Sequence, residues 1–324
     1  MTIKITTANG GSDSLDFGCA QTAIVATVTG TEVSSGEGKL EFKTTTGGTS
    51  ATKMTIAANG TVTFAGGLGD ISVSSLNGGQ LGGRRNIVYN GEMKVAQRSA
   101  SVAGLGAATG YFTLDRWNIN TNNSAGRFTM TQTADGPAGF ANCLKLDCTT
   151  ADTSIAASEY LSIKQKFEGQ DLQQLHKGIA TAKQVTVSFY VKANAVFTFG
   201  VELADIDNQR QITKLFDTTT GWVRHEVTYA ADVDDGSSPF DDDNGQSLDL
   251  NFWLHAGSTY TSGTLNTAAW ADVTAANRVA GIDSFYSSTD NEFFITGVQM
   301  EIGDTATPFE HRSYGEELAL CQRY

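Results

Sequence analysis

The residues best suited to ligand chemistry in this chain lie in one alternating stretch, residues 247–255. Apolar residues at every second position predict a β-strand with one buried face, and they are Leu248, Leu250, Phe252 and Leu254. The opposite face would carry Asp249, Asn251, Trp253 and His255. A Trp ring can cover a pyranose face while carboxylate and amide groups bond its hydroxyls. The stretch therefore predicts a glycan-binding face. The alternative is that this face packs against a loop or a neighbouring subunit.

A second alternating strand offers one more candidate for the same site. Residues 185–191 place Val185, Val187, Phe189 and Val191 on one face and leave Tyr190 among the polar residues of the other. Tyr190 joins the glycan-binding prediction on one condition. Its strand must lie in the same sheet as residues 247–255.

Signatures of catalysis are weak. None of the four histidines forms a metal-binding pair at helical spacing, and no Gly-x-Ser-x-Gly elbow occurs. Glu202 and Asp205 could act as a carboxylate pair in glycan hydrolysis, but such a pair is defined by its separation in space. We predict no catalytic residues and no enzymatic activity, with a polysaccharide depolymerase as the alternative.

One acidic stretch, residues 232–244, is the place where calcium could bind, because calcium takes clustered oxygen ligands. Its spacing does not match the twelve-residue calcium loop that ends in Glu. We therefore predict a solvated acidic loop, and no metal or other cofactor.

Composition excludes several classes of partner. The net charge is −13, whereas nucleic-acid binders carry concentrated basic patches. No segment approaches the roughly 18 apolar residues of a membrane span, and no apolar run of a signal peptide opens the chain. The four cysteines are scattered, which favours buried free thiols in a protein made in a reducing cytoplasm.

The elements that must position these residues are strands. Period-2 alternation recurs in several runs of residues 84–312, and helix signals are sparse. Such a pattern predicts an antiparallel β-sandwich of two sheets, each with one buried face. One short helix is expected in residues 313–324, where Ser313 is the N-cap and Glu316 lies three residues later.

The N-terminal part has a different sequence pattern, with short strands and few large apolar residues. In residues 36–67, Asn59-Gly60 separates two alternating runs and predicts a hairpin. Each strand offers about two large apolar residues, and so thin a sheet is marginal alone in water. We expect it to obtain its core from other copies of itself, as the segments of fibres and stalks do. Residues 68–83, rich in Gly and Ser, resemble a linker.

A family likeness covers most of residues 84–324. Its motifs are RNIVYNG (85–91), VAQR (95–98), LDRW (114–117), QKFEGQDL (165–172), VSFYVK (187–192), ITGVQME (295–301) and TPFE (307–310). They resemble β-sandwich domains of tailed-phage tail fibres, especially those of marine phages, and the wider class of carbohydrate-binding jelly rolls. The resemblance implies a virion structural protein, trimeric as most such fibres are, that helps the particle contact its host.

One departure from that resemblance concerns a metal. Sugar-binding jelly rolls often begin Asn-Gly-Asp-Phe-Glu, and the Glu helps to hold a structural calcium. This chain has Asn90-Gly91-Glu92-Met93-Lys94. A lysine cannot ligate a cation, so the resemblance does not carry calcium to this position.

These observations predict an all-β chain in four parts: residues 1–35 for virion attachment, 36–83 for a thin, intertwined, trimeric β stalk with its linker, 84–312 for a jelly-roll-like sandwich, and 313–324 for a helical tail. The predicted function is that of a virion tail fibre that adheres to host surface glycans, made in the host cytoplasm. The expected partners are two further copies of the chain, phage tail or other virion proteins at the N-terminus, and a host glycan or receptor. The alternative is a purely architectural fibre or a capsid or tail appendage without sugar affinity.

Overall fold

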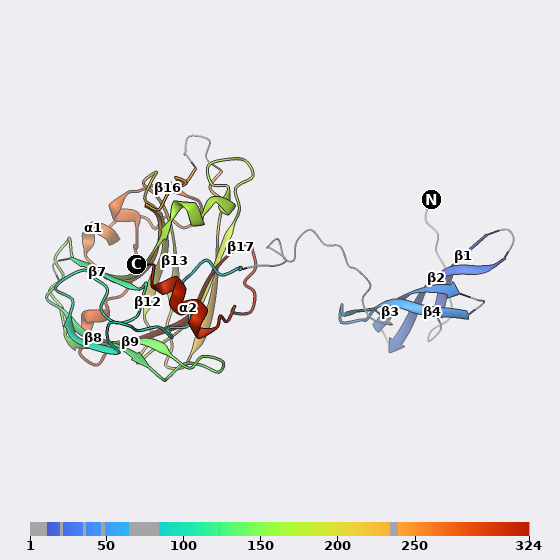
Figure 1. Cartoon of the computed structure of the whole chain (residues 1–324), viewed down its shortest axis with the longest axis horizontal. Coiled ribbons are helices and arrows are strands. Elements are labelled where there is room, and N and C mark those ends of the chain that lie inside the picture. The colour runs from blue at the N-terminus through green and yellow to red at the C-terminus, as the bar shows by residue number, and fades with distance from the viewer. Residues whose placement is uncertain are drawn as a thin grey trace. The chain divides into compact units, whose positions relative to one another are not determined.

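The computed structural model describes residues 12–19, 22–34, 37–46, 49–64, 84–122, 124–233 and 239–323. The chain forms two compact units, residues 1–73 and 74–324. Figure 1 shows that both units are built mainly of strands. The predicted linker, residues 68–83, lies outside the described residues.

The N-terminal unit is one antiparallel sheet. Its strands, in spatial order, are β1 (Ser12–Cys19), β2 (Thr22–Ser34), β3 (Glu37–Thr46), β4 (Thr49–Ile56) and β5 (Val62–Phe64). The predicted hairpin at Asn59-Gly60 is confirmed: Gly60 has a φ of 81° and the turn joins β4 to β5. Because β2 pairs with β3, strands from the predicted attachment region and stalk share this sheet.

One face of this sheet collects the large apolar side chains of its strands. Cross-strand register aligns Val28 with Phe42, Phe42 with Met54 and Met54 with Phe64, and it aligns Leu40 with Ile56 and Ile56 with Val62. Residues in register share a face. We call these residues the apolar stalk face: Val28, Leu40, Phe42, Met54, Ile56, Val62 and Phe64.

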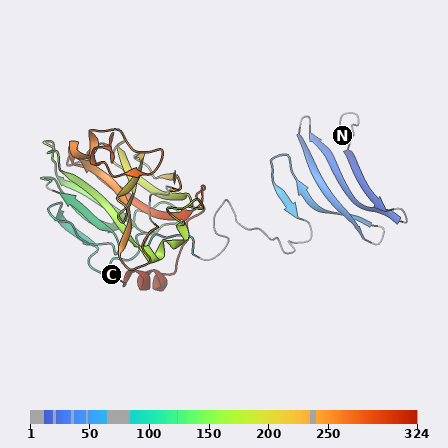
Figure 2. The same cartoon turned by 90° about the horizontal axis from the view of Figure 1, so that it is seen from above.

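The unit does not cover this face by itself. Figure 2 shows the sheet as a single layer of strands. Val62 is 48% exposed and Phe64 is 39% exposed. Among the residues of the unit whose side chains are described, only Thr29 is buried. The described part of the unit therefore lacks a hydrophobic core of its own.

The C-terminal unit is a sandwich of two six-stranded antiparallel sheets. The first sandwich sheet runs β16 (Ala271–Asp272), β13 (Arg210–Asp217), β12 (Thr198–Asp205), β15 (Gln246–Ala256), β10 (Tyr160–Glu168) and β7 (Asn118–Asn122). The second sandwich sheet runs β14 (Val223–Tyr229), β11 (Val185–Ala193), β17 (Glu292–Ile302), β9 (Cys143–Thr150), β8 (Arg127–Thr133) and β6 (Ser101–Leu105). The predicted fold class is confirmed.

Aromatic side chains join the two sheets across the core. Phe189 of β11 meets Phe252 of β15 with ring centroids 5.0 Å apart and planes at 80°, an edge-to-face contact. Phe199 of β12 meets Phe293 of β17 at 5.6 Å. Trp117, which lies just before β7, is fully buried beside Phe252. The alternating apolar residues of the sequence therefore form the contact between the sheets.

The C-terminal helix forms where its capping residues predict it. α2 (Tyr314–Cys321) begins after Ser313, whose hydroxyl accepts a hydrogen bond from the Glu316 amide. Inside the unit, the backbone N–H of Asn90 donates a hydrogen bond to the carboxylate of Glu317, so the helix is fixed to the segment that precedes the first strands of the sandwich. Cys143, Cys148 and Cys321 are buried free thiols, as expected.

Candidate functional site

The outer face of the first sandwich sheet carries the polar side chains that the sequence singled out. Leu248, Leu250 and Phe252 are buried in the core, as their alternation predicts. On the opposite face, register places Lys166 beside Asp249, Lys164 beside Asn251 and Ser162 beside Trp253. Strand β12 adds Glu202 next to Asn251.

A covering segment, residues 257–283, buries one end of this face. It contains α1 (Ser258–Thr261) and η3 (Ala275–Asn277). Trp253 is 2% exposed because its ring lies 5.5 Å from Tyr260, 5.6 Å from Tyr160 and 4.8 Å from the guanidinium of Arg278. In this structure the ring presents no open face to a sugar. This matches the alternative in which the face packs against a loop.

The covered end is an internal polar network around Glu202. Arg278 donates two hydrogen bonds of 2.7 Å to the Glu202 carboxylate, which is fully buried. Trp253 Nε1 donates to the same carboxylate at 2.9 Å and the Asn251 amide at 3.1 Å. Asn251 and Trp253 therefore lie together, and through Glu202 they are linked to Arg278 of the covering segment.

A β-bulge separates His255 from its neighbours. Trp253 pairs with Ser162, but His255 pairs with the core residue Leu161, so Leu254 is the extra residue of β15. The His255 ring is fully buried, 5.1 Å from the Tyr286 ring, and its Nδ1 lies 2.8 Å from the Ser284 hydroxyl. Burial lowers the pKa of His255 to about 4. The bulge thus takes His255 off the predicted face.

Tyr190 does not meet the condition set for it. Its strand, β11, belongs to the second sandwich sheet, whereas residues 247–255 belong to the first. The Tyr190 ring packs on Phe140 at 5.3 Å. The structure therefore does not bring Tyr190 together with Asp249, Asn251 and Trp253.

The open end of the outer face holds a cleft of about 300 Å³. It forms where the end of β10, the start of β15 and the segment before β7 meet. Its lining residues are Tyr111, Arg116, Lys166, Phe167, Glu168, Asn244 and Gln246. Tyr111 is 36% exposed, and the Arg98 guanidinium lies 5.6 Å from its ring centroid. The cleft combines a partly exposed aromatic ring with amide and charged groups, the mixture that polar ligands such as sugars require.

Asp249 connects this cleft to the predicted site. Its carboxylate accepts hydrogen bonds from Lys164 at 3.0 Å and from Gln246 at 2.7 Å. Burial raises the pKa of Asp249, and the nearby Lys164 opposes that rise. Burial likewise raises the pKa of the Tyr111 hydroxyl, which keeps it a hydrogen-bond donor at neutral pH. Asp249 therefore positions Gln246, one of the residues that line the cleft.

Few local sequence patterns mark the residues that line the cleft. Tyr111 precedes the LDRW motif at 114–117 but belongs to no alternating run. Asn244 ends the acidic stretch and Gln246 follows it, and that stretch drew interest only as a calcium loop. Lys166, by contrast, falls in strand β10, and its alternation with Phe167 would mark it as outward-facing. Its proximity to Asp249 depends on a strand pairing 83 residues apart in sequence.

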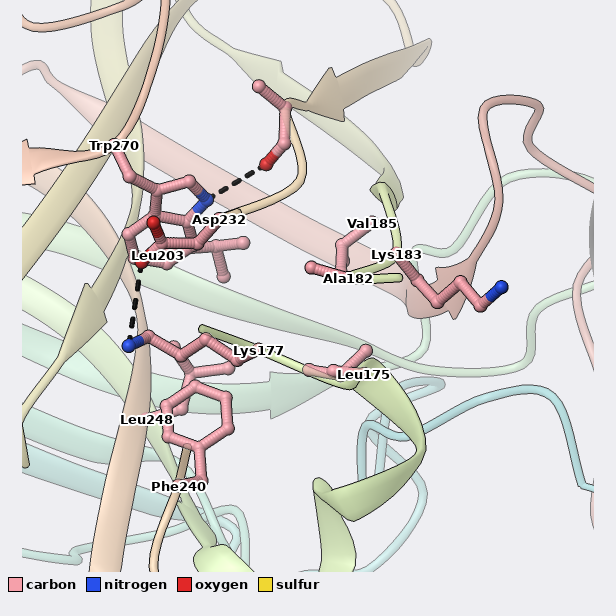
Figure 3. A pocket seen from close by; sticks show the side chains of 11 residues that line it. Leu175, Lys177, Ala182, Lys183, Val185, Leu203, Asp232, Phe240, Leu248 and Trp270 are labelled. Atoms are coloured by element: carbon pink, nitrogen blue, oxygen red, sulfur yellow. Dashed lines mark hydrogen bonds and ion pairs between the residues drawn. The ribbon is translucent and has the colours of Figure 1, made fainter. Parts of the chain in front are cut away.

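A second cavity, near Lys177, is too small for a sugar. Figure 3 shows the Lys177 ammonium directed at Asp232, and Asp205 lies 2.6 Å from the same ammonium. Asp232 lies 3.5 Å from the same ammonium and 3.0 Å from Arg210. The cavity itself measures about 20 Å³, room for about one water molecule. Buried ion pairs of this kind position the surrounding strands.

Two carboxylates at the positions considered for calcium are engaged by cations of the chain. Asp232, at the start of the acidic stretch, is engaged by Lys177 and Arg210. Lys94 pairs with the Glu92 carboxylate and donates to the Arg312 carbonyl at 2.8 Å, so a side-chain ammonium supplies the positive charge there. Across the described ranges, no group of three metal-ligating side chains comes together.

Among the described residues, no helix is both long and apolar enough to cross a membrane.

No protein-family model and no curated protein matches this sequence. Solved structures with a similar arrangement include a family 11 carbohydrate-binding module of a cellulosomal cellulase of Clostridium thermocellum, with 13% identity over 64% of this chain and 100% of that one, at a TM-score of 0.30. A family 61 module in complex with β-1,4-galactotriose has 10% identity over 68% of this chain and 99% of that one, at 0.33. A tandem of family 22 modules from Paenibacillus barcinonensis has 14% identity over 73% and 49%, at 0.31. No conclusion on function is drawn from likenesses this distant.

Proposed function

We propose that the sandwich unit binds glycans in the cleft beside Tyr111. The cleft carries this proposal because it places a partly exposed aromatic ring next to the amides of Asn244 and Gln246 and the charged groups of Arg116 and Lys166. Aromatic rings cover the apolar faces of sugar rings, and amide and charged groups bond their hydroxyls. Of the predicted residues, Asp249 then supports the cleft through its hydrogen bond with Gln246, and Asn251 and Trp253 belong to the network under the covering segment.

The experiment is to replace Tyr111 with alanine and measure binding to a panel of neutral and acidic oligosaccharides by isothermal titration calorimetry. We expect the affinity for the bound glycan to fall roughly tenfold, which corresponds to about 1.4 kcal/mol. The loss arises because the ring no longer covers the sugar face. Tyr314→Ala is the matched control, since Tyr314 is 57% exposed on α2 and lines no part of the cleft.

An unchanged affinity of the Tyr111→Ala variant would contradict this site. Binding that Tyr314→Ala weakens as much as Tyr111→Ala does would contradict it as well. No binding by the wild-type chain to any glycan in the panel would favour the architectural alternative. Shortened polysaccharide after incubation would favour a depolymerase, although Glu202 and Asp205 are both buried in ion pairs with Arg278 and Lys177.

We further propose that the chain is a phage tail fibre, in which the N-terminal unit assembles as a homotrimeric stalk, residues 1–35 attach to the virion and the sandwich adheres to host surface glycans. The resemblance of residues 84–324 to tail-fibre domains supports the virion role. The apolar stalk face supports assembly, because a single sheet with this much exposed apolar surface is marginal alone. Further copies of the same sheet would cover it with matching apolar residues.

Analytical ultracentrifugation of the full chain tests the stalk. We expect a trimer, and we expect Phe64→Asp to shift it toward the monomer, because the carboxylate would be buried in an apolar interface. Thr63→Asp is the matched control, since Thr63 is also exposed and, as the residue before Phe64 on β5, points to the opposite face. A stable wild-type monomer would contradict the assembly, as would equal dissociation of both variants.

A further inference from the structure

We infer that the cleft beside Tyr111 selects an acidic glycan, one that carries a carboxylate or sulfate group, and that Lys166 binds this anion. The inference rests on the proposed function and adds the chemical class of its ligand. It follows from the charged residues that line the cleft: two cations, Arg116 and Lys166, and one carboxylate, Glu168, which pairs with Arg323.

The carboxylates of the cleft are already engaged by cations of the chain. Glu168 accepts hydrogen bonds from Arg323 at 2.9 and 2.7 Å and one from Gln170. Asp249, next to the cleft, accepts one from Lys164 at 3.0 Å. Both are at most 5% exposed. Neither carboxylate needs a cation from a ligand.

The cleft also holds a cation with no such partner. Lys166 forms no ion pair within 4.0 Å with any residue that the structure describes, and its side chain is partly exposed. Its acidic neighbour in register, Asp249, forms its ion pair with Lys164, and the charge of Lys166 acts on that carboxylate only from beyond ion-pair distance. Arg116 lines the same cleft, with its guanidinium 4.4 Å from the Tyr89 ring centroid. An ammonium held at the wall of a cleft favours a ligand that brings a negative charge.

The excess of acidic residues in the rest of the chain contrasts with the cations at this cleft. The chain carries 35 acidic and 22 basic residues, so the molecule as a whole repels anions. An acidic polysaccharide would be bound only where the attraction of local cations exceeds the repulsion by the net negative charge of the chain. The amides of Asn244 and Gln246 can donate hydrogen bonds to carboxylate or sulfate oxygens as well as to hydroxyls.

The test compares three probes of matched length by calorimetry: a galacturonate oligosaccharide, a sulfated galactan oligosaccharide and the neutral galactan oligosaccharide. We expect the full chain to bind at least one acidic probe about tenfold more tightly than the neutral probe at low salt. We expect 0.5 M NaCl to reduce that preference, because exposed charges are screened. Preference for the uronate identifies the carboxylate as the bound group, and preference for the sulfated probe identifies the sulfate.

Variants of one lysine assign the anion site. Lys166→Gln should bring the acidic and neutral probes to within about twofold of each other, and Lys166→Arg should keep the preference because it keeps the charge. Lys183→Gln is the matched control. It removes the same charge from a lysine that lines a different cavity and whose ammonium points away from it in Figure 3.

Three results would overturn the inference, and they are distinguishable. Binding that depends on Tyr111 but is equal or tighter for the neutral probe overturns the acidic class and leaves the proposed function standing. A preference for acidic probes that survives Lys166→Gln overturns the assignment of the anion to Lys166. Absence of binding by all three probes and by the wider panel overturns the proposed function, and the inference with it.

Discussion

Replacing Arg278 with methionine is expected to lower the free energy of unfolding by about 3–5 kcal/mol. The reason is the partner that the substitution leaves behind. Glu202 is fully buried and receives two hydrogen bonds of 2.7 Å from the guanidinium. Without Arg278 the carboxylate keeps only neutral donors, Trp253 and Asn251, and its charge is uncompensated. Urea denaturation followed by circular dichroism measures the loss.

Two further variants separate this cause from simple loss of packing. The double variant Glu202→Gln with Arg278→Met should recover much of the loss, because a neutral amide still accepts from Trp253 and no charge is stranded. Arg84→Met is the control for an exposed pair. The Arg84 and Glu316 side chains are 53% and 36% exposed, so its effect should stay within about 1 kcal/mol. A double variant as unstable as Arg278→Met alone would contradict this account.

Acidification is expected to destabilise the sandwich by about 3 kcal/mol between pH 6.5 and pH 4, through His255. In the unfolded chain this histidine has an ordinary pKa near 6.5, whereas burial lowers the pKa in the folded state to about 4. Between these values the unfolded state binds a proton that the folded state does not, so the stability falls as pH falls, by about 1.4 kcal/mol per pH unit. Below about pH 4 the loss from this group levels off.

The groups that face His255 set the size of this effect. Glu159 lies 3.8 Å from its Nε2, and the charge of Asp152 favours protonation; neither outweighs burial beside the Tyr286 ring. Asp249 acts in the opposite direction. Because its pKa is raised in the folded state, the folded protein binds this proton at a higher pH than the unfolded chain does, and stability rises as the pH falls.

Urea denaturation at half-unit steps from pH 7 to pH 4, on the wild type and on His255→Asn, measures the contribution of this residue. The variant should show a shallower slope between pH 6.5 and 5, because asparagine does not titrate. The same slope in both proteins would show that other groups cause the acid sensitivity.

Local patterns predicted the strands well, because the formation of a strand, turn or helix cap depends mainly on residues close together in the sequence. The alternation of Leu248, Leu250 and Phe252 fixed which face of β15 is buried. Asn59-Gly60 marked its turn, and Ser313 marked the start of α2. These features depend on backbone geometry within a few residues, and that geometry is coded locally.

The site was harder to predict because it depends on contacts between distant segments. Alternation says that Trp253 faces away from the core, but not that Tyr260 and Arg278 will cover it. The bulge at Leu254 breaks the period-2 pattern without any Gly or Pro to signal it, so His255 was placed on the wrong face. The membership of Tyr190 in the other sheet is a matter of topology, on which side-chain periodicity carries no information.

The apolar stalk face has a consequence for how tightly a polymer would be held. If copies of the chain assemble through Val62, Phe64 and the residues aligned with them, each copy adds one cleft to the assembly. Once one cleft has bound a repeating polysaccharide, binding at the next becomes intramolecular, with an effective concentration on the order of millimolar for short flexible connections. Avidity of this kind lets each cleft bind weakly and release quickly, while the assembly as a whole stays on the surface.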